Sequence, residues 1–377
     1  MTTVSRRALL TLTAAGATAA VLPARAWAAD PVAAADPWWK PMRTAIENVP
    51  DGELPTATAA QVRLTTAAGS WTGRSGVADV VTRAPVPAGA RFRIGSVTKT
   101  FTATVVLQLA AEGRVRLDAP VALYLPGLLP AAYRSMTVRH LLDHRTGLPV
   151  PSSPDGVAWQ IEHRFDRHRA EDLVRAALEH EREFEPGTRQ RYTNMGPIVA
   201  GLLIRRVTGR TYGDEIHRRI ARPLGLRDTR VPGHDPAIRG PHARGYQELG
   251  GRLVDVTRWN QSGTPASGDM ISSVRDLDVF TRALFGGRLL PAAQQRELFA
   301  LPAEVRGAKY SAGLQSLGGG LWGKSGSRYG YSAALAATAD GGSRLIYSVN
   351  ATDAKSTDET PVVGRIIGTA LALITGG

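Results

Sequence analysis

The chain of 377 residues contains no cysteine. Disulfide bonds are therefore excluded, even in an oxidising compartment where they would be able to form. A thiol nucleophile and a zinc site built from cysteine ligands are excluded as well. The fold must be stabilised by its core alone, and any covalent catalysis must use another nucleophile.

The sequence also lacks a long apolar run and a basic tract. No stretch is long and apolar enough for a durable membrane span. No cluster of Lys and Arg is interleaved with aromatic residues, which argues against nucleic-acid binding. The composition, with 43% hydrophobic and 21% charged residues, is ordinary for a soluble globular protein of one large or two smaller domains. The N-terminus accounts for part of the net charge of +13. Scattered surface arginines explain the remainder most simply, and affinity for an anionic cell envelope is the alternative.

The N-terminus has the pattern of an export signal. Ser5-Arg6-Arg7-Ala8-Leu9-Leu10 is a twin-arginine start, and a run rich in Ala, Leu and Thr follows as far as Leu22. Ala26-Trp27-Ala28 then resembles a cleavage site. We expect residues 1–28 to be a twin-arginine signal and the protein to be secreted; the alternative is a frayed basic terminus. Cleavage would leave a net charge of +10.

A serine and a lysine precede the most apolar helical segment. The run from Thr102 to Ala111 ends at Gly113 and is too apolar for a surface helix, so it predicts a buried one. Ser96 lies at its start, and Lys99 shares its helical face because three residues separate them. A lysine in an apolar surround has a lowered pKa and can take a proton from a serine hydroxyl. The simpler interpretation is a helix N-cap beside an ordinary lysine.

Hydrophobic periodicity predicts strands near both ends of the chain and helices between them. Residues 61–66 and 71–77 predict one hairpin, and residues 331–339 and 344–350 another around Asp340-Gly341-Gly342-Ser343. This order implies one α/β unit with a helical insertion. The predicted helices span residues 39–49, 121–125, 138–143, 170–180, 195–208, 273–284 and 361–375.

Two later segments add polar side chains. Asn194 suits the N-cap of the helix that Gly209 closes, and Tyr192 lies just outside that rigid start. The simpler role of Tyr192 is a loop aromatic that packs on the core. The second segment is Gly318-Gly319-Gly320-Leu321-Trp322-Gly323-Lys324-Ser325-Gly326-Ser327.

Ser96-x-x-Lys99, Tyr192-x-Asn194 and Lys324-Ser325-Gly326 stand in an order that resembles the serine β-lactamase and D,D-peptidase superfamily. The resemblance is greatest to the class C branch, the secreted D-alanyl-D-alanine carboxypeptidases. It implies an antiparallel sheet flanked by N- and C-terminal helices, with an inserted all-helical domain. Residues 29–117 and 262–377 would form the sheet domain and residues 118–261 the insertion, with the active site between them. Further similar segments lie at residues 92–99, 124–128, 138–148 and 245–246.

The resemblance also implies roles for the three catalytic side chains. Ser96 would be the nucleophile that forms an acyl-enzyme. Lys99 would accept its proton, alone or shared with Tyr192. Tyr192 would also relay a proton to the leaving amine. The substrate would be a peptide ending in D-Ala-D-Ala, or a β-lactam, acted on by a monomer without cofactor or metal.

Substrate binding is implied for a second set of residues. Asn194 would bind the substrate amide and hold Lys99. Lys324, Ser325 and Gly326 would lie on an inner strand, where the lysine and the hydroxyls of Ser325 and Ser327 would meet a substrate carboxylate. The backbone N–H groups of Ser96 and Ser327 would form the oxyanion hole.

The sequence departs from the family pattern at three places. Lys324 replaces a histidine that many carboxypeptidases of this branch carry, and it keeps a positive charge there. Ser325 replaces the usual threonine. Gln315 and Ser316 occupy a strand position where some relatives have arginine, so one carboxylate anchor is missing and strict D-Ala-D-Ala specificity is in doubt.

Other functions remain open at this stage. Gly318-x-x-x-x-Gly323-Lys324-Ser325 matches a phosphate-binding loop, but residues 327–331 favour a strand where such a loop needs a helix. A β-lactamase or an esterase would use the same Ser96, Lys99 and Tyr192. An α/β-hydrolase is disfavoured because the chain has no G-x-S-x-G motif. For the histidines, we expect surface positions at 163 and 168, and packing or capping at 140 and 144.

Overall fold

The computed structural model describes residues 36–50, 52, 54–150, 156–356 and 360–375. The expected export signal at residues 1–28 lies outside them. Trp38–Gly377 clusters as a single unit, so the expected boundaries between a sheet domain and a helical domain stay predictions. No helix in the described part of the chain is long and apolar enough to cross a bilayer.

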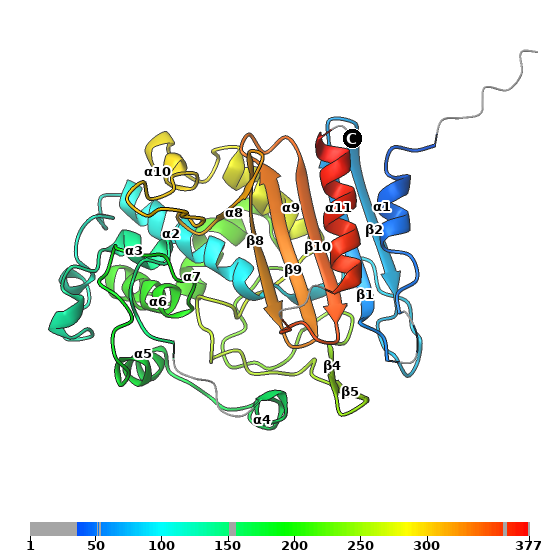
Figure 1. Cartoon of the computed structure of the whole chain (residues 1–377), viewed down its shortest axis with the longest axis horizontal. Coiled ribbons are helices and arrows are strands. Elements are labelled where there is room, and N and C mark those ends of the chain that lie inside the picture. The colour runs from blue at the N-terminus through cyan, green and yellow to red at the C-terminus, as the bar shows by residue number, and fades with distance from the viewer. Residues whose placement is uncertain (1–35, 51, 53, 151–155, 357–359, 376–377) are drawn as a thin grey trace, which may run out of the picture. The chain divides into compact units, whose positions relative to one another are not determined.

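A six-stranded antiparallel sheet organises this unit (Figure 1). The strand order is β2-β1-β10-β9-β8-β7, so the first strand pairs with the last near the middle of the sheet. Both predicted hairpins are present, β1–β2 and β9–β10. Two small pairs, β3–β6 and β4–β5, complete the strands. The strands are β1 Ala57–Thr66, β2 Gly69–Gly76, β3 Arg91–Arg93, β4 Tyr246–Leu249, β5 Arg252–Asp255, β6 Ile271–Ser273, β7 Gln315–Gly318, β8 Leu321–Arg328, β9 Tyr331–Thr338 and β10 Arg344–Ala351.

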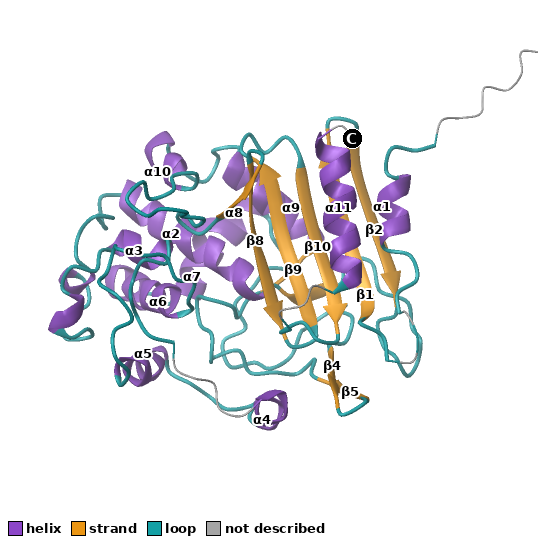
Figure 2. Ribbon diagram, in the orientation of Figure 1, coloured by secondary structure: helices purple, strands orange, loops and turns teal. Residues whose placement is uncertain are grey.

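Helices cover both faces of the sheet because its strands alternate apolar side chains to both sides. Tyr347 and Val349 pack with α1 and α11, whereas Ile346 and Leu335 belong to the core formed with α2 and α9. Figure 2 shows α11 in front of the sheet and the larger group of helices beside it. The helices are α1 Lys40–Ala45, α2 Thr98–Ala111, α3 Val138–Leu142, α4 Gly156–Glu162, α5 Ala170–Leu178, α6 Met195–Thr208, α7 Tyr212–Ile216, α8 Arg222–Leu224, α9 Val274–Phe285, α10 Ala292–Glu297 and α11 Pro361–Thr375.

The buried helix α2 is present as predicted, and its residues from Thr98 to Leu107 are all buried. Its beginning differs from the prediction. Ser96 lies in a short 3-10 turn, Gly95–Val97, that leads into the helix. Helix α6 begins and ends as predicted. It ends at Gly209 because glycine adopts the left-handed conformation of a helix C-terminus at little steric cost.

The insertion is not all-helical. Residues 246–255 form the β4–β5 hairpin, and Glu248 N donates to Thr352 O just beyond β10. This backbone bond joins the end of the insertion to the main sheet. The hairpin was missed because its two strands have four residues each, and only the first two residues of β4 and none of β5 are buried.

The glycine run is a hairpin between β7 and β8 rather than a phosphate loop. Gly318, Gly319 and Gly320 all have positive φ, which glycine adopts without steric cost. Lys324 and Ser325 follow inside β8, and β8 continues into β9. A phosphate loop requires a helix N-terminus at this point, so the nucleotide-binding alternative is wrong.

Candidate active site

Strand pairing holds the nucleophile candidate at the end of β3. β3 pairs with β6, and Ile94 N donates a 3.0 Å hydrogen bond to Met270 O. Thr98 Oγ1 accepts from Met270 N at 3.2 Å, which fixes the first turn of α2 to the same segment. Ser96 is thereby held between β6 and the helix.

Lys99 has three polar neighbours. Its Nζ lies 3.0 Å from Ser96 Oγ, 2.7 Å from Asn194 Oδ1 and 2.8 Å from the Ser267 carbonyl. A neutral amine has two N–H donors and one lone pair. The two carbonyl oxygens accept both donors, and the lone pair then faces the Ser96 hydroxyl. The arrangement fits a general base.

The charge state of Lys99 also suits this role. Only 3% of the residue is exposed. Burial lowers the pKa of Lys99 well below its ordinary value, and the positive charge of Lys324 lowers it further. The neutral amine is therefore more available near neutral pH than for a solvated lysine.

Asn194 and Tyr192 reach the site from the start of α6. Asn194 occupies the N-cap position, but its side chain makes no capping bond and turns to Lys99 instead. Thr193 Oγ1 accepts from Met195 N at 3.1 Å in its place. The sequence placed Asn194 at the helix start correctly, and the structure assigns its side chain to the lysine.

Two lysine ammonium groups lie close to the Tyr192 ring. Lys99 Nζ lies 4.9 Å and Lys324 Nζ 4.7 Å from the ring centroid, distances at which the ring face attracts a cation. The Tyr192 hydroxyl is buried without a hydrogen bond of good geometry. Burial raises the pKa of Tyr192, and the nearby Ser96 hydroxyl offsets only part of this effect. Tyr192 therefore holds its proton at neutral pH, which favours Lys99 as the base.

Lys324 lies on the inner face of β8, and Ser325 on the opposite face. Lys324 pairs with Leu335 of the helix-side core, whereas Ser325 pairs with Ala334 of the α11-side core. Lys324 Nζ donates a 2.8 Å bond to the Ser325 carbonyl. Burial lowers the pKa of Lys324 to about 8, so it is largely charged at pH 7.

Two glycines allow β8 to approach the nucleophile. A Cβ on Gly326 would lie 2.2 Å from Ile94 O and 2.5 Å from Ser96 N. A Cβ on Gly95 would lie 2.6 Å from Ser327 N. The backbone N–H groups of Ser96 and Ser327 are thus brought to adjoining segments, as an oxyanion hole requires.

The predicted site residues meet in one cleft of about 370 Å³. Ser96, Tyr192 and residues 324–327 line it directly. Lys99 and Asn194 lie behind Ser96 through the bonds already described. The structure therefore brings together all eight residues predicted from sequence, while their catalytic roles remain predictions.

Four other residues of the site were not predicted from sequence. The Ser267 carbonyl binds Lys99, and a backbone oxygen leaves no motif in a sequence. His144 packs against Tyr192 and Tyr310, with ring centroids 4.6 and 5.0 Å away. This packing agrees with the role expected for His144, but the sequence did not place His144 at the active site. Asp353 lines the cleft from the loop after β10.

The remaining histidines of interest are structural. His140 completes a capping box with Thr137 at the start of α3. His168 is exposed as expected, whereas His163 is half-buried and stacks on Trp159. Sequence had placed His163 on the open surface, because it could not show the stacking partner four residues earlier.

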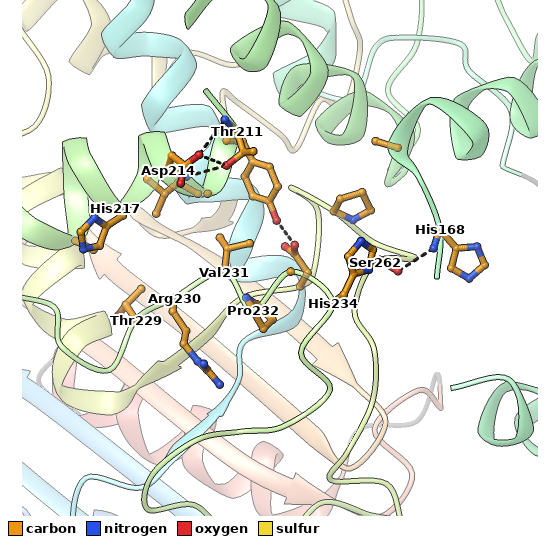
Figure 3. Close-up of a pocket in the computed structure, with 18 residues that line it drawn as sticks. His168, Thr211, Asp214, His217, Thr229, Arg230, Val231, Pro232, His234 and Ser262 are labelled. Carbon is orange, nitrogen blue, oxygen red and sulfur yellow. Dashed lines mark hydrogen bonds between the residues drawn. The ribbon is translucent and has the colours of Figure 1, made fainter. Parts of the chain in front are cut away.

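A second hollow of about 500 Å³ lies beside α7 (Figure 3). Its hydroxyl groups serve local structure: Thr211 caps α7, and Ser262 Oγ accepts from His168 N. At its base the Tyr212 hydroxyl donates to the Asp269 carboxylate. No lysine is among the residues that line this hollow, so the cleft at Ser96 is the better candidate for catalysis.

Comparison with known proteins identifies a family and several relatives. A family model described as Beta-lactamase matches residues 7–366. Penicillin-binding protein 4* of Bacillus subtilis is 30% identical over 161 residues, which are 41% of this chain and 34% of that protein. The Escherichia coli protein named Beta-lactamase is 30% identical over 185 residues, 48% of this chain and 45% of that protein. The chain thus spans less than half the length of these curated relatives.

Solved structures match over a greater length. A D-stereospecific amidohydrolase from Streptomyces has a TM-score of 0.76 and 34% identity, and the match covers 89% of this chain and 98% of that chain. The D-amino acid amidase of Ochrobactrum anthropi has a TM-score of 0.75 and 28% identity over 90% of this chain and 99% of that chain. Because the family model spans nearly the whole sequence, the chain belongs to the β-lactamase family.

Proposed function

We propose that this protein hydrolyses amide bonds on the carbonyl side of a D-amino acid residue. The observation that carries the proposal is the bonding of Lys99, whose two carbonyl partners leave the amine lone pair for Ser96. The D-configuration is supported by the two solved neighbours that span most of the chain, a D-stereospecific amidohydrolase and a D-amino acid amidase.

Acylation follows from these contacts. Lys99 takes the proton of the Ser96 hydroxyl as Oγ attacks the amide carbon, and the carbonyl oxygen becomes negative between the N–H groups of Ser96 and Ser327. The C–N bond then breaks. The proton held by Lys99 passes through the Tyr192 hydroxyl to the leaving nitrogen, so that the amine departs neutral.

Deacylation reverses the proton path. Water attacks the ester carbonyl, Lys99 accepts a water proton, and the C–O bond to Ser96 breaks as the serine regains its proton. The products are a D-amino acid, or a peptide ending in one, and an amine. The chemistry needs no group beyond these side chains and water.

The charges of the cleft favour a substrate with a free amino group. Among the described residues that line the cleft, Asp353 is the single acidic side chain and Lys324 the single basic one. Asp353 is exposed, and its carboxylate can pair with the α-ammonium of a D-amino acid amide.

The second candidate is the D-alanyl-D-alanine carboxypeptidase expected from sequence. Lys324 and the exposed Ser325 hydroxyl favour it, since both can bind a terminal carboxylate. Gln315 lines the cleft where some relatives have arginine, and a neutral amide is a weaker carboxylate partner. The neutral side chain of Gln315 therefore favours the amidase over the carboxypeptidase. A β-lactamase and an esterase use the same acylation step and are distinguished by turnover.

One set of assays separates these functions. Purified protein is incubated with D- and L-phenylalanine amide, with a peptide ending in D-Ala-D-Ala, with a short-chain ester and with a β-lactam. We expect cleavage of the D-amide well above the L-amide, and a covalent β-lactam adduct in the intact mass that is absent from Ser96→Ala. Fast cleavage of the D-Ala-D-Ala peptide alone would instead establish the carboxypeptidase, and rapid β-lactam turnover a β-lactamase. No turnover and no adduct would refute the proposal.

Lys324→Ala distinguishes the two main candidates further. Loss of the ammonium should lower kcat/KM for a carboxylate-bearing peptide more than for a neutral amide, because only the peptide loses a charge partner. Equal losses on both would contradict this role of Lys324.

The proposed place of action is outside the cytoplasm. Residues 1–28 support it through their twin-arginine pattern. Replacing Arg6 and Arg7 together by lysine should retain the protein in the cytoplasm. Export of that double variant would contradict the assignment.

A further inference from the structure

We propose that an apolar groove beside the cleft binds the leaving group of the substrate, so that the enzyme prefers amides of apolar amines over primary amides. This inference rests on the proposed amide hydrolysis. The groove has a volume of about 390 Å³ and lies between β8, β9, β10 and α11. In Figure 1, α11 crosses the sheet over β10 and leaves the same face of β8 and β9 uncovered in that view.

The groove continues the catalytic cleft. Gln315, Lys324, Ser325 and Tyr347 line both. β7 pairs with β8 only as far as Gly323, so the edge of β8 from Lys324 onward is not covered by that strand. A substrate lying at Ser96 can extend across this edge into the groove.

The position of Tyr192 indicates which end of the substrate enters the groove. The leaving nitrogen needs a proton, and Tyr192 is the neutral acid beside Ser96. Its ring lies 4.7 Å from Lys324 Nζ, and Lys324 stands where cleft and groove meet. The leaving group therefore lies on the Lys324 side, and the acyl group on the other.

The lining of the groove selects an apolar occupant. Ala334 and Ala336 form a floor of small side chains. Leu317 and Leu371, which are 49% and 41% exposed, stand with Ile367 and Ile374 around it. Among the described residues that line the groove, Lys324 is the single charged one, and its side chain lies on the face of β8 opposite to Ser325. An alkyl or aryl amine fills this space and covers exposed apolar surface, whereas ammonia leaves it empty.

A substrate series with one acyl group tests this inference. D-phenylalanine amides with methyl, propyl, butyl and hexyl groups on nitrogen all give the same acyl-enzyme, so differences in kcat/KM report the leaving group alone. Each buried methylene contributes about 0.8 kcal/mol, close to fourfold. We expect kcat/KM to rise by up to about fourfold per methylene until the groove is full.

Variants locate the effect. Leu371→Lys places a charge at the exposed wall, and Ala336→Leu fills the floor; both should reduce the ratio of hexylamide to methylamide kcat/KM at least fivefold. Leu123→Lys is the matched control, because Leu123 is 62% exposed and does not line the groove. It should leave the ratio as in the wild type. Ala336→Leu keeps the test decisive if Leu371→Lys fails to fold.

The outcomes separate the two proposals. Cleavage of all amides without dependence on chain length would overturn the groove assignment and leave the proposed function standing. A chain-length dependence that both variants leave unchanged would also overturn it. A concentration-dependent dimer that Leu371→Lys dissociates would assign the groove to a second copy of the chain instead. Failure to cleave any amide, with no Ser96 adduct, would refute the proposed function itself.

Discussion

Lys99 Nζ donates a 2.7 Å hydrogen bond to Asn194 Oδ1 across 95 residues of sequence. The bond joins the first turn of α2 to the start of α6 and gives the buried amine an uncharged acceptor. A neutral acceptor does not oppose the effect of burial, so the pKa of Lys99 stays low. The chemistry of this site depends on that choice of partner.

Asn194→Asp should move the pH profile toward alkaline values. A carboxylate beside Lys99 favours the ammonium form and raises the pKa of Lys99. Because the neutral amine is the base, kcat/KM should rise with pH through that higher pKa. The profile of kcat/KM against pH measures it, with the exposed Asn48→Asp as control. An unshifted acid limb would argue against Lys99 as the base.

Gly326→Ala should abolish most activity. The added methyl group would meet Ile94 O and Ser96 N at 2.2 and 2.5 Å, so β8 must move away from the nucleophile. Losing one oxyanion donor lowers kcat by about 100-fold or more. Gly368→Ala is the control, since a methyl group there meets nothing within 4 Å. Thermal unfolding shows whether the Gly326 variant is folded; full activity in it would contradict the predicted oxyanion hole.

Above pH 8, kcat/KM for substrates with a terminal carboxylate should fall relative to kcat/KM for neutral amides. The pKa of Lys324 is lowered to about 8, so its positive charge is present below that pH and lost above it. The ratio of kcat/KM for the carboxylate peptide to that for D-phenylalanine amide should therefore fall as pH rises from 7 to 9. A constant ratio would show that Lys324 does not bind the carboxylate.

Asp269→Asn should change how stability depends on pH. Burial raises the pKa of Asp269 to about 7, against an ordinary value of 3.8. The folded state then binds the extra proton between these values, so the stability contributed by this group is complete below about pH 4 and is lost as pH rises toward 7. The free energy of unfolding of the variant, relative to the wild type, should therefore rise by up to about 1.4 kcal/mol per pH unit across that window. Denaturant unfolding of the wild type and the variant at pH 5 and pH 7 measures the effect. If the free energy of unfolding changes equally with pH in both proteins, residue 269 is not a buried, titrating carboxyl group.

Arg145→Met should destabilise the fold without touching the nucleophile. Arg145 and Asp143 form a buried ion pair at 2.7 Å, with side chains 3% and 6% exposed. Removing one partner leaves the other charge buried, which costs about 3 kcal/mol. The double variant Arg145→Met/Asp143→Leu should recover much of this loss in a denaturant titration. If the single variant is as stable as the wild type, the pair contributes little.

The sequence by itself determined the outline of the fold and the members of the site. Local patterns were sufficient for α2, α6, α11 and both hairpins, because apolar periodicity, caps and turn glycines act over a few residues. The three short motifs, through the family resemblance that they carry, pointed to the eight site residues, which the cleft and the hydrogen bonds of Lys99 bring together.

Only the tertiary structure decided how these residues interact. Asn194 stands at the N-cap position and its side chain binds Lys99, as the family resemblance implied, but only the structure shows that it makes no capping bond. The Ser267 carbonyl, the packing of His144 on Tyr192 and the groove along α11 involve segments far apart in the chain. Burial and distance between such segments set the pKa values and the shape of the cleft, and neither quantity exists until the chain has folded.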